Sequence, residues 1–254
     1  MAHFDGALPK LGSPRLRPLQ RREESELLDE QGHDPVELAA NFRDIRRVNR
    51  LLGGVSTTLR HLPRLIAAAP DNQPTTILDL ATGSGDIPLA ILRWARKHGH
   101  DVEIIASDVD DAILDLAREH TGAPPEITFA RHDARDVPLP DRSVDIVLCA
   151  LSLHHFDPDD AVRVLREMDR VCRHGFILND LRRGRMGYAA AWLAARATTR
   201  NRLTRNDAPL SVLRSYTPSE LDAMMHRARV EDAIISNHPW FRVAAVKVCG
   251  GTDA

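Results

Sequence analysis

The chain has 254 residues, 43% of them hydrophobic, which suffices for one α/β domain with a substantial core. Its formal net charge of −2 argues against a nucleic-acid partner. No apolar run is long enough for a signal peptide or a membrane span, and three cysteines without a C-x-x-C pair argue against disulfides or a zinc site. We therefore expect a cytoplasmic protein without an integral membrane segment and without a metal.

Composition divides the chain into segments. The N-terminal segment is rich in proline and charge, which predicts a flexible arm. Next, Asp34-Pro35 predicts the start of the first of two helices. A late insertion combines an alanine-rich helix with a basic loop and is the expected substrate lid. The predicted segments are the arm at 1–30, a helical lid at 31–72 and the catalytic domain at 73–254, with the insertion at about 181–212.

The most informative stretch begins with a buried strand at Ile77–Leu80. The Thr-Gly-Ser-Gly that follows cannot continue a strand, and apolar residues then recur at helical spacing from about Asp86. Gly83 and Gly85 allow a sharp turn and the close approach of a ligand. A strand, a glycine loop and a helix N-terminus predict a cofactor crevice at the carboxyl edge of a parallel sheet, although a purely structural turn is the alternative.

The spacing within this loop argues against a dinucleotide. Three positions after Gly85 stands Pro88, so the third glycine of G-x-G-x-x-G is missing. Asp79, inside the strand, suits a cationic ligand better than a pyrophosphate. The sequence Asp-Leu-Ala-Thr-Gly-Ser-Gly-Asp resembles motif I of class I S-adenosylmethionine (SAM) methyltransferases, particularly the ubiquinone/menaquinone C-methyltransferases and their small-molecule relatives. The resemblance implies SAM as the cofactor.

The strands that follow predict the fold class. Apolar runs indicate a Rossmann-like, seven-stranded, mostly parallel α/β sheet with helices on both faces and the last strand antiparallel. Thr217-Pro218, with Glu220 completing a capping box, predicts a late helix. The strands predicted after the glycine loop lie at 102–107, 127–131, 146–150, 175–179, 233–236 and 241–249.

Two further loops carry candidate cofactor ligands. Asp108 lies 23 residues beyond Gly85, where a carboxylate can accept hydrogen bonds from ribose hydroxyls. Alternatively it caps the next helix, although Asp110 could do so instead. The resemblance implies that Asp133-Ala134 belongs to an adenine-binding loop, the alternative being a solvated loop. The predicted cofactor-binding residues are Asp79, Ala81, Thr82, Gly83, Gly85, Asp108, Val109, Asp133, Ala134 and Ala150.

The acceptor is expected beside the end of the fourth strand. Transfer to a hydroxyl needs a base, and histidine has a suitable pKa. The resemblance favours His154 as the catalytic base facing the substrate, with His155 packing or capping, whereas a structural histidine is the alternative. Asp180, at the end of the fifth strand, could orient His154 or share its role. His155, Tyr216 and Trp192 are the predicted substrate-binding residues.

We therefore expect a SAM-dependent methyltransferase with a small-molecule acceptor. Residues 172–175 lack the Pro-Gly-Gly of quinone C-methyltransferases, so the leading hypothesis is the hydroxyl of a phenolic or polyketide-like secondary metabolite. C-methylation of a quinone-type lipid is the first alternative, because the Ala/Trp helix could shelter an apolar tail. A SAM-binding regulatory or scaffold protein without turnover is the second. A homodimer is compatible with the sequence.

Overall fold

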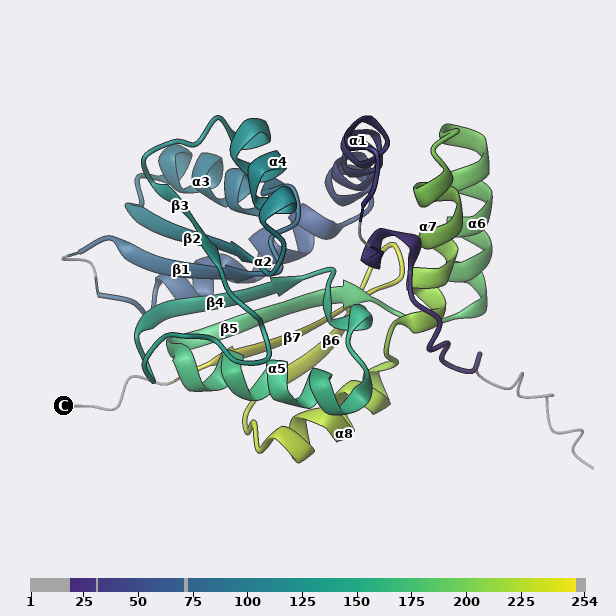
Figure 1. Ribbon diagram of the computed structural model, residues 1–254. Helices are drawn as coiled ribbons and strands as arrows, with labels where there is room; N and C mark the ends of the chain where they lie inside the picture. The colour runs from purple at the N-terminus through teal and green to yellow at the C-terminus, as the bar shows by residue number, and fades with distance from the viewer. Residues whose placement is uncertain (1–18, 31, 71–72, 250–254) are drawn as a thin grey trace, which may run out of the picture.

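The structure is a computed structural model that describes residues 19–30, 32–70 and 73–249; part of the predicted arm, residues 1–18, lies outside these ranges. A seven-stranded sheet in the order β3-β2-β1-β4-β5-β7-β6 forms its centre (Figure 1). The strands are β1 (Thr75–Leu80), β2 (Val102–Asp108), β3 (Ile127–Arg131), β4 (Val144–Ala150), β5 (Cys172–Leu181), β6 (Ile234–His238) and β7 (Arg242–Val248).

The sheet confirms the predicted fold class. Strands β1 to β5 pair in parallel, whereas β7 is antiparallel to both of its neighbours, β5 and β6. The predicted antiparallel last strand is therefore present, but it does not lie at the edge. Because β6 and β7 form a hairpin and β7 pairs with β5, the edge position is left to β6.

Helices cover both faces of the sheet (Figure 1). On one face, α5 and α8 contribute buried residues such as Leu165 and Met224 to one apolar core. On the other, α2 and α3 contribute Leu62 and Ile91 to a second core. The helices are α1 (Pro35–Leu51), α2 (Gly54–Ile66), α3 (Asp86–His98), α4 (Asp111–Thr121), α5 (Pro158–Val171), α6 (Arg185–Thr198), α7 (Arg202–Arg214) and α8 (Pro218–Ala228), with the short 3₁₀ helices η1 (Leu27–Asp29) and η2 (Leu153–His155).

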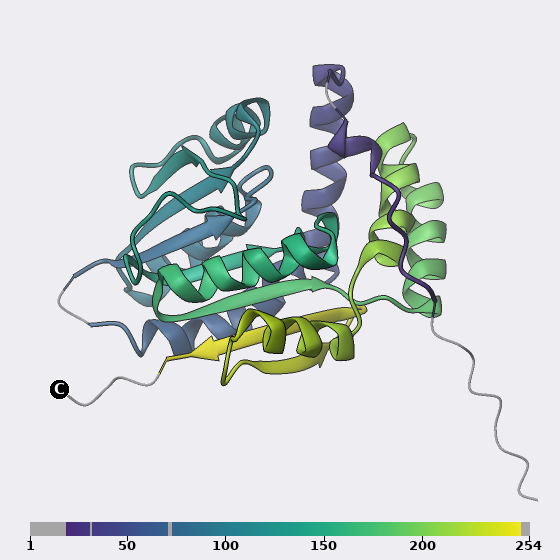
Figure 2. The ribbon, with the colours of Figure 1, turned by 60° about the horizontal axis from the view of Figure 1, so that its bottom comes forward.

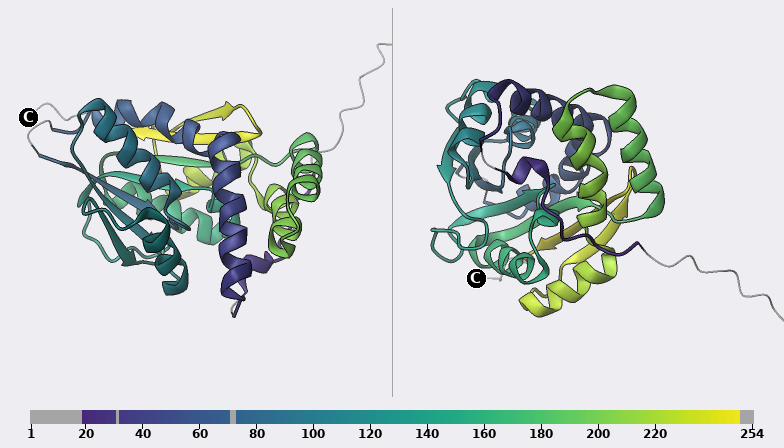
Figure 3. Two further views of the ribbon diagram at one scale, coloured as in Figure 1. Left: turned by 90° about the horizontal axis from the view of Figure 1, so that it is seen from above. Right: turned by 45° about the vertical axis from the view of Figure 1, so that its right-hand side comes forward.

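Additional elements gather at the carboxyl end of the parallel strands. Helix α1 stands beside α7, and α6 and α7 lie side by side at this end (Figure 3). Residues 19–30 run across α7, and the backbone N–H groups of Leu27 and Leu28 donate to the Asp207 carboxylate at 2.9 and 3.0 Å (Figure 2). Within the described ranges, every helix is too short or too polar to cross a bilayer.

The predicted basic loop of the insertion is wrong, because most of it forms α7. Asn201 caps this helix by accepting a hydrogen bond from the Thr204 backbone N–H. Pro209 lies inside the helix, where it removes one backbone hydrogen bond. Contacts of α7 with α1, α6 and η1 stabilise the helical conformation despite that proline, which a sequence pattern alone does not show.

Gly175 offers a test of the β5–β7 junction. It has φ +138°, and a Cβ atom there would overlap the Lys247 carbonyl oxygen of β7. Gly99, after α3, also has a positive φ, +72°, but a Cβ there meets nothing within 4 Å. We expect Gly175→Ala to lower the free energy of unfolding by about 3 kcal/mol or more, and the control Gly99→Ala by about 1 kcal/mol. Urea denaturation measures both, and equal losses would contradict the close packing inferred here.

Candidate active site

A cavity of about 810 Å³ opens at the carboxyl ends of β1, β2 and β4. Parallel pairing of β1 with both β2 and β4 brings the loops after these strands to one edge. Helix α1 and the segment around η1 form the opposite wall. The lining comes from residues 28–30, 32–33, 38–49 in part, 79–87 in part, 108–113, 131, 150–152 and 155–156. Of the two helices in the predicted lid, α1 borders the cavity, whereas α2 packs on the sheet. The predicted insertion at about 181–212 contributes no lining residue.

The glycine loop reaches the cavity through Ala81, Thr82 and Gly83. Gly83 has φ +55°, and a Cβ atom there would come within 3.4 Å of the Phe42 ring. The backbone is thus exposed to a ligand where a side chain would intrude. Gly85, a predicted cofactor-binding residue, does not line the cavity. Its φ is +69°, and a Cβ there would lie 2.9 Å from the Thr121 methyl group, so this glycine permits the packing of α4.

Three carboxylates surround the loop. Asp79, Asp86 and Asp108 all line the cavity. Burial, reinforced by repulsion from Asp86 and Asp108, raises the pKa of Asp79 to about 7. Burial also raises the pKa of Asp86, although a hydrogen bond from Asn49 (3.0 Å) opposes the shift. Such a concentration of buried negative charge suits a ligand with cationic groups, because a cation would offset both the desolvation and the mutual repulsion.

The surroundings of Asp108 bear on its two predicted roles, which are binding of the ribose and capping of the next helix. Asp110, not Asp108, caps α4, since its carboxylate accepts from the Ala112 N–H at 2.8 Å. Asp108 instead accepts the backbone N–H of Gly83 at 3.1 Å and that of Val109 at 2.8 Å. Burial raises the pKa of Asp108, and these hydrogen bonds act in the opposite direction. Asp108 therefore ties the glycine loop to the end of β2 while its side chain borders the cavity.

The predicted adenine-binding loop does not border the cavity. Asp133 forms an ion pair with Arg135 at 2.7 Å, and Arg135 also reaches Asp160 of α5. The hydrogen bonds from Arg135 lower the pKa of Asp133. Ala134 is buried in the core below α5. Neither Asp133 nor Ala134 is among the lining residues, whereas Ala150 and Val109 are.

The two histidines lie the other way round from the prediction. His154 is only 3% exposed and does not line the cavity, whereas His155 does. The reason is Asp180, whose carboxylate binds His154 Nδ1 at 2.7 Å and accepts the His154 backbone N–H at 2.9 Å. These bonds draw His154 inward and lower the pKa of Asp180 despite its burial. The predicted pairing of His154 with Asp180 is present, but His154 does not line the cavity.

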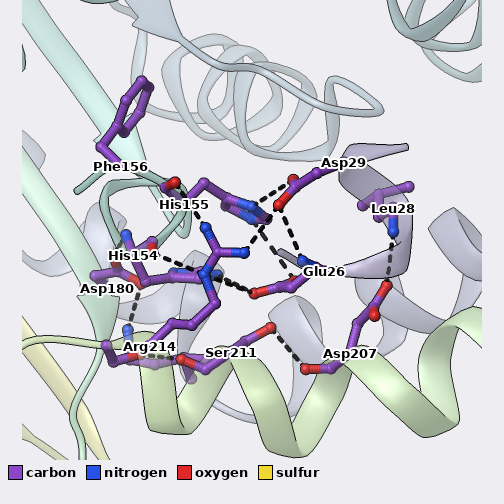
Figure 4. Close-up of polar contacts among 12 residues, drawn as sticks. Glu26, Leu28, Asp29, His154, His155, Phe156, Asp180, Asp207, Ser211 and Arg214 are labelled. Atoms are coloured by element: carbon purple, nitrogen blue, oxygen red, sulfur yellow. Dashed lines mark hydrogen bonds and ion pairs between the residues drawn. The ribbon is translucent and has the colours of Figure 1, made fainter. Parts of the chain in front are cut away.

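A buried polar cluster surrounds the histidines (Figure 4). His155 Nδ1 lies 2.8 Å from Asp29 Oδ1, and Arg214 Nη1 lies 2.9 Å from Asp29 Oδ2. Burial alone would lower the pKa of His155, but the charges of Glu26 and Asp29 raise it to about 9. The pKa of Asp29 falls to about 2, because the hydrogen bond and charge of His155 outweigh burial. At neutral pH these groups form an ion pair beside the cavity.

The other two predicted substrate ligands lie elsewhere. Tyr216 is 4% exposed and donates its hydroxyl hydrogen to the Phe156 carbonyl at 2.8 Å. Burial raises the pKa of that hydroxyl to about 12. Trp192 is 42% exposed on α6 and stacks against Arg196. Tyr216 thus supports the turn after β4, and neither residue contacts the cavity.

Several lining residues were missed by the sequence reasoning. Phe42 and Asn49 come from α1, part of the predicted helical lid, but neither was among the predicted site residues. Asp86 marks the predicted helix start, but the sequence does not show that its side chain also lines the cavity. Glu26, which supports His154 and His155 from the arm, lies in a charged stretch that predicted disorder. The available signal is the seven-residue spacing of Phe42 and Asn49, which places both on one face of a helix.

Comparison with known proteins shows which family and which relatives the chain is similar to. The family described as "Methyltransferase domain" matches residues 77–175, from β1 to the first part of β5. The chain is 37% identical over 130 residues to the demethylmenaquinone methyltransferase of Deinococcus radiodurans, covering 50% of this chain and 51% of the relative. It is 32% identical over 108 residues to the ubiquinone/menaquinone biosynthesis C-methyltransferase of Rickettsia akari, covering 39% and 43%.

The chain therefore spans about half the length, or less, of these curated relatives. Among solved structures, a SAM-dependent methyltransferase from Aquifex aeolicus has the same fold, with a TM-score of 0.57 at 16% identity over 85% of this chain and 98% of that one. Residues 77–175 thus match a methyltransferase domain, and the chain is similar in sequence to ubiquinone/menaquinone methyltransferases and in fold to a SAM-dependent methyltransferase.

Proposed function

We propose that this protein transfers a methyl group from SAM to a hydroxylated aromatic small molecule. The observation that carries this proposal is the cavity in which two buried carboxylates, Asp79 and Asp108, and the half-buried Asp86 surround a glycine loop at the carboxyl edge of the sheet. Leu151, Phe156 and His155 also line this cavity, and we assign the acceptor to this part of it.

The residues of the cavity fit SAM. Its amine and sulfonium are cationic, and Asp79 and Asp86 would face them with buried negative charge. Asp108 would accept ribose hydroxyls, while the exposed backbone at Gly83 allows close contact. SAM, when bound, supplies an electrophilic methyl group. The chain's own residues would position the acceptor in line with that group and exclude water, which is where most of the rate enhancement arises.

His155 is the group best placed to meet the acceptor. It borders the cavity, and its pairing with Asp29 fixes the imidazole orientation. Its positive charge would stabilise an acceptor that binds as the oxyanion, having released its proton to solvent. His154 and Asp180 lie directly behind it, with the His154 and His155 rings 4.4 Å apart. We therefore assign His154 and Asp180 to positioning the turn that carries His155.

Whether an oxygen or a ring carbon is methylated depends on how the acceptor is oriented in the cavity. O-methylation of a phenolic or polyketide-like hydroxyl needs only that hydroxyl beside His155. C-methylation of a quinone precursor is the second candidate, because the chain resembles a demethylmenaquinone methyltransferase over half its length. Deprotonation of a ring hydroxyl assists either reaction.

Product analysis distinguishes the two candidates. The full chain is incubated with SAM carrying a ¹³C-methyl group and with a panel of phenols, hydroxylated polyketides and naphthohydroquinones. We expect a ¹³C-methoxy NMR signal from at least one phenol. A ring-methyl signal would instead support C-methylation, and SAM binding without turnover on any panel member would contradict the proposed reaction.

Asp108 and Asp133 make a matched test of the cofactor site. Both are aspartates after neighbouring strands, but only Asp108 lines the cavity. We expect Asp108→Ala to weaken SAM affinity by about 10- to 100-fold, the value of a lost charge-assisted hydrogen bond. Asp133→Ala should change it by less than about twofold. Isothermal titration calorimetry measures both, and equal losses would place the adenine loop in the site after all.

The pKa of Asp79 predicts a pH dependence of SAM binding. A carboxyl pKa raised to about 7 means that Asp79 becomes neutral as the pH falls below that value. A cationic ligand prefers the ionised form, so SAM affinity should weaken by at most about tenfold per pH unit below 7. Asp79→Asn should flatten the profile between pH 5.5 and 7.5. A wild-type affinity that is constant over this range would contradict the assignment.

A further inference from the structure

Glu26, His154 and His155 turn three possible metal ligands toward one point next to the cavity (Figure 4). One ligand atom from each residue lies within 4.8 Å of those of the other two. The residues come from two distant parts of the chain, the segment before η1 and the turn η2. We propose that these three side chains bind a divalent transition-metal ion of the zinc class, a site of the two-histidine, one-carboxylate type.

The two histidines are oriented as metal ligands are. In metal sites, a ligating imidazole usually donates its other ring N–H to a carboxylate, which fixes the tautomer. Here His154 Nδ1 lies 2.7 Å from Asp180, and His155 Nδ1 lies 2.8 Å from Asp29. Each carboxylate therefore holds Nδ1 and leaves Nε2 to point toward Glu26. Two adjacent histidines with separate carboxylate partners give two donors on the same side.

The Glu26 carboxylate provides the second, independent observation. Glu26 is 2% exposed, and its Oε1 atom has no hydrogen-bond partner among the residues that the structure describes. The nearest nitrogens are His154 Nε2 at 3.7 Å and Arg214 Nε at 3.9 Å, while His155 Nε2 lies 3.9 Å from Oε2. Ligands of one zinc ion stand about 3 to 3.5 Å apart. A small contraction would therefore bring all three onto one ion.

Arg214 sets a limit on the affinity. Its guanidinium donates to the His154 and His155 carbonyls, at 3.3 and 2.7 Å, and so holds the turn that carries the ligands. It also pairs with Asp29. The positive charge of Arg214 close to Glu26 opposes a second cation. A metal ion must also displace the proton that His155 carries at neutral pH, so we expect micromolar rather than tighter binding.

The site is reachable from the cavity, because His155 and Asp29 line it. Three protein ligands leave a fourth position for a water or a substrate oxygen. If methyl transfer takes place as proposed above, an ion here would polarise the acceptor hydroxyl and favour loss of its proton. This role depends on the proposed function, whereas metal binding itself does not.

Cobalt titration of the full chain tests the site. The protein, without an affinity tag and treated with a chelator, is titrated at pH 7.5 with Co²⁺, which absorbs visible light strongly when bound in a four-coordinate site. We expect absorption that saturates at one equivalent and is displaced by Zn²⁺. No saturable absorption, or no Zn²⁺ binding by calorimetry, would overturn the proposal.

Variants locate the ion. Glu26→Gln keeps the shape of the side chain, and His155→Gln changes the ligand at the cavity; each should weaken Zn²⁺ binding at least tenfold. His238→Gln is the matched control, since His61 and His238 form another close imidazole pair, with their Nε2 atoms 3.1 Å apart. Affinity lost only in the control would overturn the assignment, as would wild-type affinity in both ligand variants.

Measurements on the same wild-type and variant proteins distinguish the proposed metal site from the proposed methyl transfer. Circular dichroism checks that each variant is folded, and calorimetry with SAM measures the donor site. Binding of SAM without binding of Co²⁺ would overturn the metal site alone. Binding of Co²⁺ without binding of SAM would leave the metal site and overturn the proposed function.

Discussion

The concentration of buried carboxylates at one edge of the sheet is the constraint on which this structure depends. Asp79, Asp86 and Asp108 lie round the glycine loop, where burial opposes their ionisation. A fold gains nothing from three such groups in one cavity without a compensating cation. Their placement is therefore best understood as the cost of binding a positively charged ligand.

A second polar network joins the periphery to this centre. Arg214 of α7 contacts the carbonyls of both histidines, and Asp207 of the same helix binds the backbone before η1. Helix α7 thus fixes both Glu26 and the turn after β4 without lining the cavity itself. Among the described residues, the insertion and the rest of α7 therefore support the turn that carries the histidines and do not line the cavity.

The two histidines show what a local sequence motif predicts and what depends on residues distant in the chain. The adjacent histidines 154 and 155 indicated an acceptor site, and in the structure His155 lines the cavity. Which of the two faces the cavity depends on Asp180 of β5, 26 residues further along the chain. Similarly, Asp108 ends β2 and Asp133 lies shortly after β3, but of these two aspartates Arg135 engages only Asp133.

The sequence by itself determined the strands, the glycine loop and the helix caps at Asp34 and Thr217, because these features depend on residues close together in the chain. The resemblance that implies SAM rests on the same local motif. Only the tertiary structure decided that Glu26 meets His154 and His155, that Gly85 packs against α4, and that α7 is helical across Pro209. These features depend on contacts between residues distant in sequence, for which a single chain carries no periodic signal.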